Sequence, residues 1–423
     1  MTVAMIGFAV LLLLGVPIAY VLGLTTVIYI FVAGNIDLML TVPQRLYTGM
    51  ENYGLLAIPL FMLAGELMNS GGITKRLVNV AKGFIGHYRG GLAYVNVSAN
   101  MMLAAIIGSA TAQIAMMSRT MVPEMEKAGY SRPFSAATTA AAGLLGPIIP
   151  PSMMFIIYGV SSGTSIGDMF MAGVIPGIIL GFSFMVLIAI IGMKEKWPTQ
   201  PKATGKEMWK SFINVIPALL VPIIIIAGIL SGWFTATESA AIACVVSLIV
   251  GTFLYRELKL SSLPAIMTNT AVTTAVITIL ISMANIFGMV LAFEQIPKQI
   301  AEWMVGLSDS TFVFLLLVNI FLLLVGMFMD GIAALIILVP IFMPLLAEYG
   351  VNPIHFGIII CINLTIGILT PPVGSGLFIA SSLTNVKIGA LVKALLPFLI
   401  VALLVLMLLT YIPVLTLWLP GLN

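Results

Sequence analysis

The chain has 423 residues, of which 61% are hydrophobic and only 8% are charged. Because a soluble domain has roughly 25% charged residues, this composition excludes a protein that meets water over most of its surface. The small net charge of +3 gives no sign of nucleic-acid binding. Apolar stretches of about 20 residues recur along the chain, which predicts an all-α polytopic membrane protein.

The apolar stretches predict nine long helices. In chain order, they are expected near 4–31, 53–70, 134–163, 169–193, 211–231, 237–255, 263–292, 355–383 and 390–416. The first has no basic leader before it and is expected to be a retained helix. Two amphipathic stretches, 73–88 and 296–306, are expected to be interfacial arms or to contact a partner.

Two further apolar segments, 92–127 and 311–347, are too long for one crossing. Small residues interrupt each of them, around Ser109 in the first and around Asp330-Gly331 in the second. Each segment is therefore either two full crossings or a re-entrant hairpin that returns to the side from which it entered.

The charges that flank these segments favour hairpins. Basic residues lie on both sides of 92–127, and mostly acidic residues lie on both sides of 311–347. Under the positive-inside rule, both ends of the first segment face the cytoplasm and both ends of the second face outward. The same rule places the lysine-rich loop 194–210 in the cytoplasm, and it predicts a cytoplasmic N-terminus.

The two halves of the chain repeat. Adding 221 carries Gly146 to Gly367 and the pair Pro150-Pro151 to Pro371-Pro372, whereas adding 223 carries Asn96 to Asn319. The register slips within the hairpins, so Ser109 pairs either with Asp330 or with Ile332. The helix near 211–231 is an extra crossing that inverts the second copy. The predicted units are a first repeat at 1–193, a cytoplasmic loop and linking helix at 194–231, and a second, inverted repeat at 232–423.

The proline pairs predict two broken helices, at 134–163 and 355–383. Proline cannot donate a helical hydrogen bond, and broken backbone at membrane depth is tolerated where it is buried in protein or lines a site. A single break is often only a packing kink. Two breaks at matched positions indicate the binding site of a secondary transporter.

Free N–H groups at half-helix starts suit a carboxylate, and exposed carbonyl groups suit a dehydrated Na⁺. The candidate substrate-binding residues are Ser109, Thr111, Pro151, Ser152, Gly374 and Ser375. The candidate Na⁺-binding residues are Gly108, Ser109, Gly146, Pro147, Pro150, Asp330, Gly331, Gly367, Thr370 and Pro371.

Several of these residues have a structural alternative. Asp330 is a carboxylate within an apolar hairpin, which favours an ion site, but it also suits the cap of the second hairpin arm. The hydroxyl groups of Ser109 and Thr111 could bond only to their own backbone. Farther along, Thr235 and Glu238 fit a capping box, a structural role.

The sequence resembles the large membrane subunit of tripartite ATP-independent periplasmic (TRAP) transporters over essentially the whole chain. The resemblance lies in the small residues at the two hairpin tips, in the two proline breaks and in the stretch Thr235-Ala236-Thr237-Glu238. The resemblance implies an elevator-type, Na⁺-driven importer of organic acids in the bacterial inner membrane. It implies two partners, a small membrane subunit on a separate chain and a soluble periplasmic substrate-binding protein. By the same match, Ser109, Thr111, Ser152, Asp330 and Gly331 line the substrate and sodium sites.

Two other classes of function are less consistent with the residues. An ion channel would also use broken helices, but rings of charge or a repeated filter motif are missing from the sequence. An intramembrane enzyme needs a nucleophile–base pair or a metal set, and neither is recognisable. No nucleotide-binding loop occurs, and no organic cofactor is expected. Among organic acids, C4-dicarboxylates, sialic acid and other sugar or keto acids all remain open.

Overall fold

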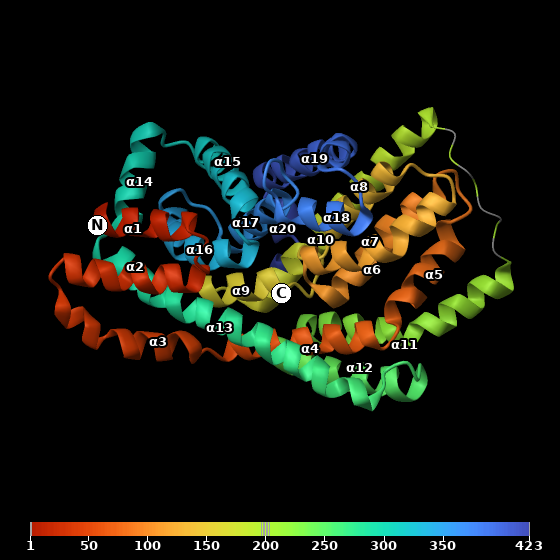
Figure 1. The fold of residues 1–423 in the computed structure, drawn as a ribbon, viewed down its shortest axis with the longest axis horizontal. Coiled ribbons are helices and arrows are strands. Elements are labelled where there is room, and N and C mark those ends of the chain that lie inside the picture. The colour runs from red at the N-terminus through yellow and green to blue at the C-terminus, as the bar shows by residue number, and fades with distance from the viewer. Residues whose placement is uncertain (1, 196, 198, 200–201, 203, 423) are drawn as a thin grey trace.

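The computed structural model describes residues 2–195, 197, 199, 202 and 204–422, and within these residues the chain is helical without strands (Figure 1). Lys196, which contributed to the predicted cytoplasmic charge, lies outside the described residues. The helices of the first half are α1 (Thr2–Leu13), α2 (Ile18–Val32), α3 (Val42–Met50), α4 (Ala57–Ser70), α5 (Ile73–Ile85), α6 (Gly91–Ile107), α7 (Ala110–Lys127), α8 (Arg132–Gly143), α9 (Met153–Ser162) and α10 (Ile166–Lys194).

The second half continues the series after the loop. Its helices are α11 (Gly205–Leu230), α12 (Ala236–Ile249), α13 (Leu263–Phe293), α14 (Ile296–Leu307), α15 (Thr311–Phe328), α16 (Gly331–Glu348), α17 (Pro353–Gly367), α18 (Ser375–Thr384), α19 (Ile388–Tyr411) and α20 (Val414–Leu417). Short turns complete them at Ile36–Leu40, Tyr53–Leu56, Val250–Leu254, Leu260–Ser262 and Pro420–Leu422. Among the described residues, eight helices are long and apolar enough to cross a membrane.

The prediction of one long helix at 4–31 is wrong. The chain turns at Gly15, which has a φ of +74°, and Pro17 precedes α2. Helices α1 and α2 fold against each other, and Ala4 packs with Tyr29 and Ile30 in one apolar cluster. A left-handed glycine followed by a proline ends one helix and starts the next, so the continuous apolar run forms a helical hairpin.

This hairpin places the start of the chain beside the end of α13. Ala4 and Tyr29 pack with Val290 near the end of α13, and the Tyr29 hydroxyl donates a hydrogen bond of 2.5 Å to Glu294. The cytoplasmic prediction required one crossing between residues 4 and 31. Because the chain returns instead, its start lies at the same end of the molecule as Glu294.

Both long apolar segments are hairpins. In the first, α6 and α7 run antiparallel, and Asn96 near the start of α6 lies 3.5 Å from the sulfur of Met125 near the end of α7. In the second, the Thr311 hydroxyl donates to the carbonyl of Tyr349 at 3.1 Å, which joins the two ends of the α15–α16 pair. Figure 1 places the first hairpin to the right of the centre and the second to the left, so they approach the middle from opposite directions.

Both predicted breaks are present. Residues 144–152 separate α8 from α9, and residues 368–374 separate α17 from α18. The peptide bonds Pro150–Pro151 and Pro371–Pro372 are both cis. The proline pairs therefore interrupt two helices at matched positions of the two halves.

A buried amide network ties each hairpin to neighbouring helices of its own half. In the first half, the Asn96 amide donates to Thr139 on α8 at 2.6 Å, and Gln113 on α7 donates to Asn100 on α6 at 2.8 Å. In the second half, Asn363 on α17 donates to Asn319 on α15, which in turn donates to Thr410 on α19 at 3.3 Å. Asn96 and Asn319 thus have equivalent roles, as the 223-residue offset predicts.

Ion pairs gather at the end of the molecule that the sequence assigns to the cytoplasm. Arg76 pairs with Glu257 at 2.8 Å, and Lys82 pairs with Glu124. The Arg89 side chain donates to the carbonyl of Glu195 at 2.7 Å. These contacts join segments far apart in sequence at one face, as the charge pattern predicts. At the other end of α12, the expected capping box of Thr235 and Glu238 is present.

Candidate functional site

Both hairpin tips start a helix with a side-chain cap. The Ser109 hydroxyl accepts from the N–H of Ala112 at 3.5 Å at the start of α7, and the Asp330 carboxylate accepts from the N–H of Ile332 at 3.0 Å at the start of α16. The helices that follow both have 18 residues. Ser109 therefore corresponds to Asp330 and not to Ile332, and the register slip lies in the first hairpin arm, between Asn96 and Ser109.

The two tips meet at one cavity of about 150 Å³. It is lined by Met62, Gly108, Ser109, Ala110, Thr111, Pro147, Met153, Met154, Thr273, Ile277, Asp330, Gly331, Ile332, Leu364, Thr365 and Ile368. The structure thus brings together six of the predicted residues: Gly108, Ser109, Thr111, Pro147, Asp330 and Gly331. They come from opposite hairpins and from the first break.

Three helices begin at this cavity. The first residues of α7, α9 and α16 all belong to its lining. Each helix start presents unpaired N–H groups and a partial positive charge, which attract an anion. At α7 the Ser109 and Thr111 hydroxyls, 3.2 Å apart, lie beside these N–H groups. The arrangement suits one carboxylate group.

Asp330 is the one ionisable side chain among the described lining residues. Its carboxylate and an anionic substrate in the same small cavity would repel each other. A cation that binds with the substrate offsets this repulsion, because it attracts both negative charges. Asp330 itself is exposed.

The first break carries a second feature that suits a cation. A Cβ atom added at Gly146 would lie 2.6 Å from the side-chain oxygen of Gln113 and 3.1 Å from the carbonyl oxygen of Ser109. That Gln113 oxygen is buried and has no hydrogen-bond partner in the described structure. A buried acceptor without a partner costs free energy, and a bound Na⁺ would satisfy it together with the neighbouring carbonyl. Sequence reasoning missed Gln113.

Other residues predicted at the first break lie beside the cavity. Ser152 is fully buried, and its hydroxyl donates to the carbonyl of Pro147 at 2.5 Å while capping α9. Pro151 and Ser152 line a small void of about 20 Å³ behind Gly108. Pro150 forms the cis bond with Pro151 and does not line the cavity.

The second break also packs closely against its hairpin. A Cβ atom at Gly367 would lie 2.6 Å from the backbone of Gly326 on α15. The Thr370 hydroxyl donates to the carbonyl of Ile366 at 3.0 Å. Five residues predicted at this break fall outside the cavity lining: Gly367, Thr370, Pro371, Gly374 and Ser375.

Three lining residues come from helices outside the hairpins and breaks. Met62 lies on α4, and Thr273 and Ile277 lie on α13. Sequence reasoning missed them because nothing local marks them. One signal was available in the sequence. At an offset of 223, α4 corresponds to the end of α13, so the two helices occupy matching positions in the two repeats.

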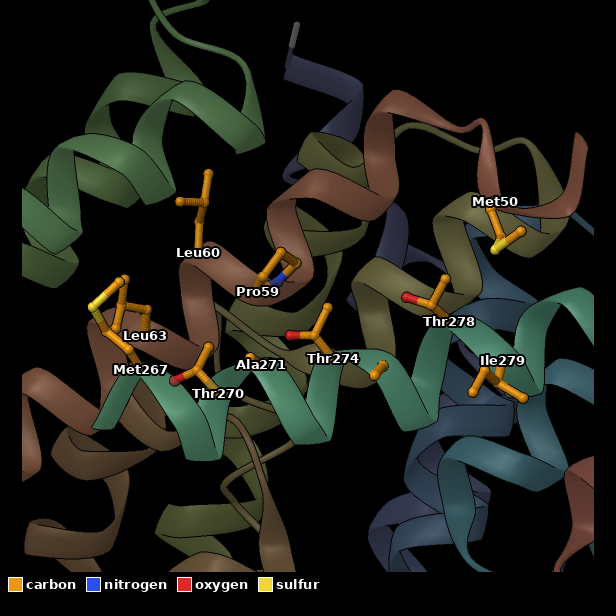
Figure 2. Close-up of a pocket in the computed structure, with 11 residues that line it drawn as sticks. Met50, Pro59, Leu60, Leu63, Met267, Thr270, Ala271, Thr274, Thr278 and Ile279 are labelled. Atoms are coloured by element: carbon orange, nitrogen blue, oxygen red, sulfur yellow. The ribbon is translucent and has the colours of Figure 1, made fainter. Parts of the chain in front are cut away.

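Two larger hollows lie away from the hairpin tips. A groove of about 580 Å³ lies between α4 and α13, and none of its described lining residues is ionisable. Figure 2 shows this lining, with Leu60 and Leu63 on α4 and Thr270 and Thr274 on α13. A hollow of about 940 Å³ lies among the loops that join α9 to α10 and α11 to α12. Neither contains a predicted site residue.

Comparison with known proteins gives consistent matches along the chain. Residues 5–415 match the family model "Tripartite ATP-independent periplasmic transporter, DctM component". The C4-dicarboxylate TRAP transporter large permease protein DctM of Pseudomonas aeruginosa is 42% identical, with 89% of this chain and 88% of that protein covered. The sialic acid TRAP transporter large permease protein SiaM of Vibrio cholerae is 38% identical, with 98% and 97% covered.

A longer relative is the isethionate TRAP transporter permease protein DctMQ of Oleidesulfovibrio alaskensis, which is 40% identical; the match covers 98% of this chain and 65% of the relative. Among solved structures, the YdaH transporter of Alcanivorax borkumensis has a TM-score of 0.62 at 15% identity, covering 92% of this chain and 89% of that one. MtrF of Neisseria gonorrhoeae has a TM-score of 0.60 at 13% identity, covering 93% and 86%. These two structures share the fold.

Proposed function

This chain belongs to the DctM component family of TRAP transporters, whose members are permeases and not enzymes, and on that premise we propose that it imports an organic acid together with Na⁺. The observation that carries the proposal is the cavity between the two hairpin tips, where three helix starts meet Asp330. The helix starts attract the substrate carboxylate, and the negative charge of Asp330 attracts a cation.

Na⁺ is proposed to bind at two places in this arrangement. Asp330 supplies a carboxylate at the second tip, and Gln113 supplies a buried, unpartnered oxygen beside Gly146 at the first break. Both are hard oxygen ligands, which suit Na⁺ better than a soft metal. Bound Na⁺ stabilises the hairpin tips and the first break in the arrangement that holds the substrate. Binding of Na⁺ therefore raises the affinity for the substrate, and this coupling drives uptake.

We propose an elevator motion for transport. The hairpins and broken helices bind substrate and Na⁺, whereas α4 and α13 form a fixed wall along one side of the cavity through Met62, Thr273 and Ile277. Movement of the hairpins past this wall opens the cavity to one side of the membrane and then to the other.

The proposed partners follow from the family. TRAP large permeases work with a small membrane subunit and a periplasmic substrate-binding protein, and the longer DctMQ relative is consistent with a permease fused to its small subunit. We place this chain in the bacterial inner membrane with both partners. The C4-dicarboxylate and sialic acid permeases among its relatives mark the range of acids from which its substrate comes.

Transport in proteoliposomes tests the proposal. With both partner proteins present, we expect uptake of the organic acid to require an inward Na⁺ gradient, because Asp330 leaves the cavity with an excess negative charge when Na⁺ is absent. The measurement is accumulation of radiolabelled acid in NaCl and in KCl. Equal uptake in the two salts would contradict the coupling of transport to Na⁺. Uptake without the binding protein would contradict the proposed role of that partner.

The N-terminus is proposed to lie on the outer side of the membrane, at the same end as Glu294. We expect Val3→Cys to react with a membrane-impermeant maleimide in intact cells, because Val3 is 53% exposed and the α1–α2 hairpin returns the chain to its starting side. Lys387→Cys, from a stretch assigned to the cytoplasm, is the control and should react only after lysis. If Val3→Cys is labelled only after lysis, the N-terminus lies on the cytoplasmic side and the proposed orientation is wrong.

A further inference from the structure

The two halves pack differently against their hairpins, and this difference indicates where the second hairpin docks in another state, an inference that rests on the proposed elevator motion. In the first half, α4 packs against α6. A Cβ atom added at Gly65 on α4 would lie 2.8 Å from the carbonyl oxygen of Ile106 on α6. The missing side chain of Gly65 therefore provides the space into which the end of α6 fits.

The equivalent place in the second half is open. At the 223-residue offset, Gly65 corresponds to Gly288 on α13, where an added Cβ atom would meet no described neighbouring atom within 4 Å. Ile107, the last residue of α6, is partly buried, whereas Phe328, the last residue of α15, is 65% exposed. Both partners of an equivalent contact are thus present in the second half, but they are apart.

Gly288 continues the face of α13 that lines the cavity. It lies about three helical turns beyond Ile277, a cavity residue, so the two residues are on the same side of the helix. Between them, Asn285 corresponds to Met62, which lines the cavity from α4. The Asn285 side chain is partly exposed and makes no hydrogen bond to the residues that the structure describes. A polar side chain in a membrane helix is costly without a partner, so a partner is expected in another state.

The inverted repeat explains why this open surface matters. The two halves share one fold in opposite orientations, so a packing that one half adopts is available to the other half as well. If the halves exchange their packing, the cavity opens to the opposite side of the membrane. The contact that α4 makes with the first hairpin therefore indicates the contact that α13 makes with the second hairpin after the exchange.

We propose that Gly288 is the docking point for the end of α15 in the second end state of the transport cycle. As the hairpins move along α13, Phe328 and the backbone beside it come to lie against Gly288, as the end of α6 lies against Gly65 in this state. The contact at Gly65 is lost in the same movement, and Asn285 enters the cavity lining in place of Met62. Gly288 permits the close approach because it has no side chain.

Disulfide crosslinking tests the docking without a known substrate. Cys244→Ala and Cys361→Ala first remove the native thiols. In this background, we expect Gly288→Cys and Phe328→Cys to crosslink under copper phenanthroline, because the two positions meet in the second end state. The measurement is the crosslinked fraction, by mass spectrometry of the full chain reconstituted in proteoliposomes with its small membrane subunit. KCl is the salt, so that the empty protein exchanges between its end states.

Gly288→Cys with Phe312→Cys is the control pair. Phe312 is also exposed on α15, but its ring stacks on Tyr411 and is turned toward α19. Because a disulfide needs Cα atoms within about 7 Å of each other, we expect at least about fivefold more crosslinking in the Phe328 pair than in the control. Equal fractions in the two pairs overturn the docking.

Uptake by the same vesicles separates this result from the proposed function. Radiolabelled succinate and N-acetylneuraminate are the probes, with the periplasmic binding protein added, in NaCl and in KCl. Na⁺-driven uptake without the Phe328 crosslink overturns the docking and leaves the proposed import standing. Equal uptake in the two salts contradicts the proposed coupling, which the crosslink does not measure.

Gly65→Leu tests the exchange from the other half. A side chain at this position crowds the carbonyl of Ile106 and disfavours the packing of α4 on α6. In the Gly288→Cys and Phe328→Cys pair, we expect Gly65→Leu to raise the crosslinked fraction at least about twofold, because it shifts molecules toward the second end state. Gly389→Leu is the control, since a Cβ atom there has nothing within 4 Å, and it should leave the fraction unchanged. The same fraction in both variants contradicts the exchange.

Discussion

Asp330→Asn is expected to lower Na⁺-driven uptake by about tenfold or more while leaving the protein folded. The carboxylate is the one charged group among the described cavity residues, and its oxygen accepts the hydrogen bond that caps α16. Asparagine keeps an oxygen for the cap and is as good an N-cap as aspartate, so the helix start survives. The charge that attracts Na⁺ is lost, and a loss of about 1.4 kcal/mol corresponds to the tenfold effect.

The measurement is the Na⁺ concentration at half-maximal uptake, together with the melting temperature. Asp309→Asn provides the control, because Asp309 is an exposed acid near the base of the same hairpin and outside the cavity. We expect the control to retain the wild-type Na⁺ response. An unchanged half-maximal Na⁺ concentration in Asp330→Asn would remove this residue from the ion site and leave it only the role of a cap.

Gly146→Ala is expected to abolish most Na⁺ binding at the first break. The added methyl group would lie 2.6 Å from the Gln113 oxygen and 3.1 Å from the Ser109 carbonyl oxygen, so it occupies the space between the two proposed ligands. Overpacking of this kind costs about 1–3 kcal/mol, and it displaces the ion from the position where both oxygens reach it. We expect the Na⁺ affinity to fall at least about tenfold and uptake to fall with it.

Titration of the melting temperature with NaCl, with KCl as the reference salt, measures this effect directly. Gly389→Ala serves as the comparison, because Gly389 lies in α19 and a Cβ atom there has nothing within 4 Å. That substitution should preserve the Na⁺ response. A Na⁺-dependent rise of the melting temperature as large in Gly146→Ala as in the wild type rules out an ion beside Gln113.

Much of the fold could be predicted from local signals. The proline pairs indicate both broken helices, because proline has no N–H group to donate a helical hydrogen bond. The flanking charges identify both hairpins, because Lys and Arg gather in cytoplasmic loops and so indicate which side of the membrane each end of a segment faces. The segment 4–31 misled for the opposite reason: its uniform apolar character hid the turn at Gly15 and Pro17, although these two residues were a visible signal.

The site was predictable at the tips and less so around them. Ser109 and Asp330 lie at helix starts that the small residues reveal, and both line the cavity. Gln113 becomes notable only through an oxygen that has no partner after folding. Thr273 reaches the cavity from a helix far along the chain, and no spacing within α13 distinguishes it from Thr268. Such contacts depend on packing between distant segments, which a single sequence does not contain.

The two buried amide networks have a consequence for where this protein can deform. If α6 slid along α8, the Asn96 amide would lose Thr139 as its partner, and if α7 slid along α6, the Gln113 amide would lose Asn100. Each loss in an apolar interior costs about 1–3 kcal/mol. Asn319 and Asn363 impose the same penalty on α15 and α17. At the wall formed by Met62 and Ile277, the contacts are between apolar groups that one neighbour supplies as well as another. These networks therefore resist sliding between the hairpins and the broken helices more than the apolar contacts at Met62 and Ile277 resist movement, which supports the elevator motion proposed above.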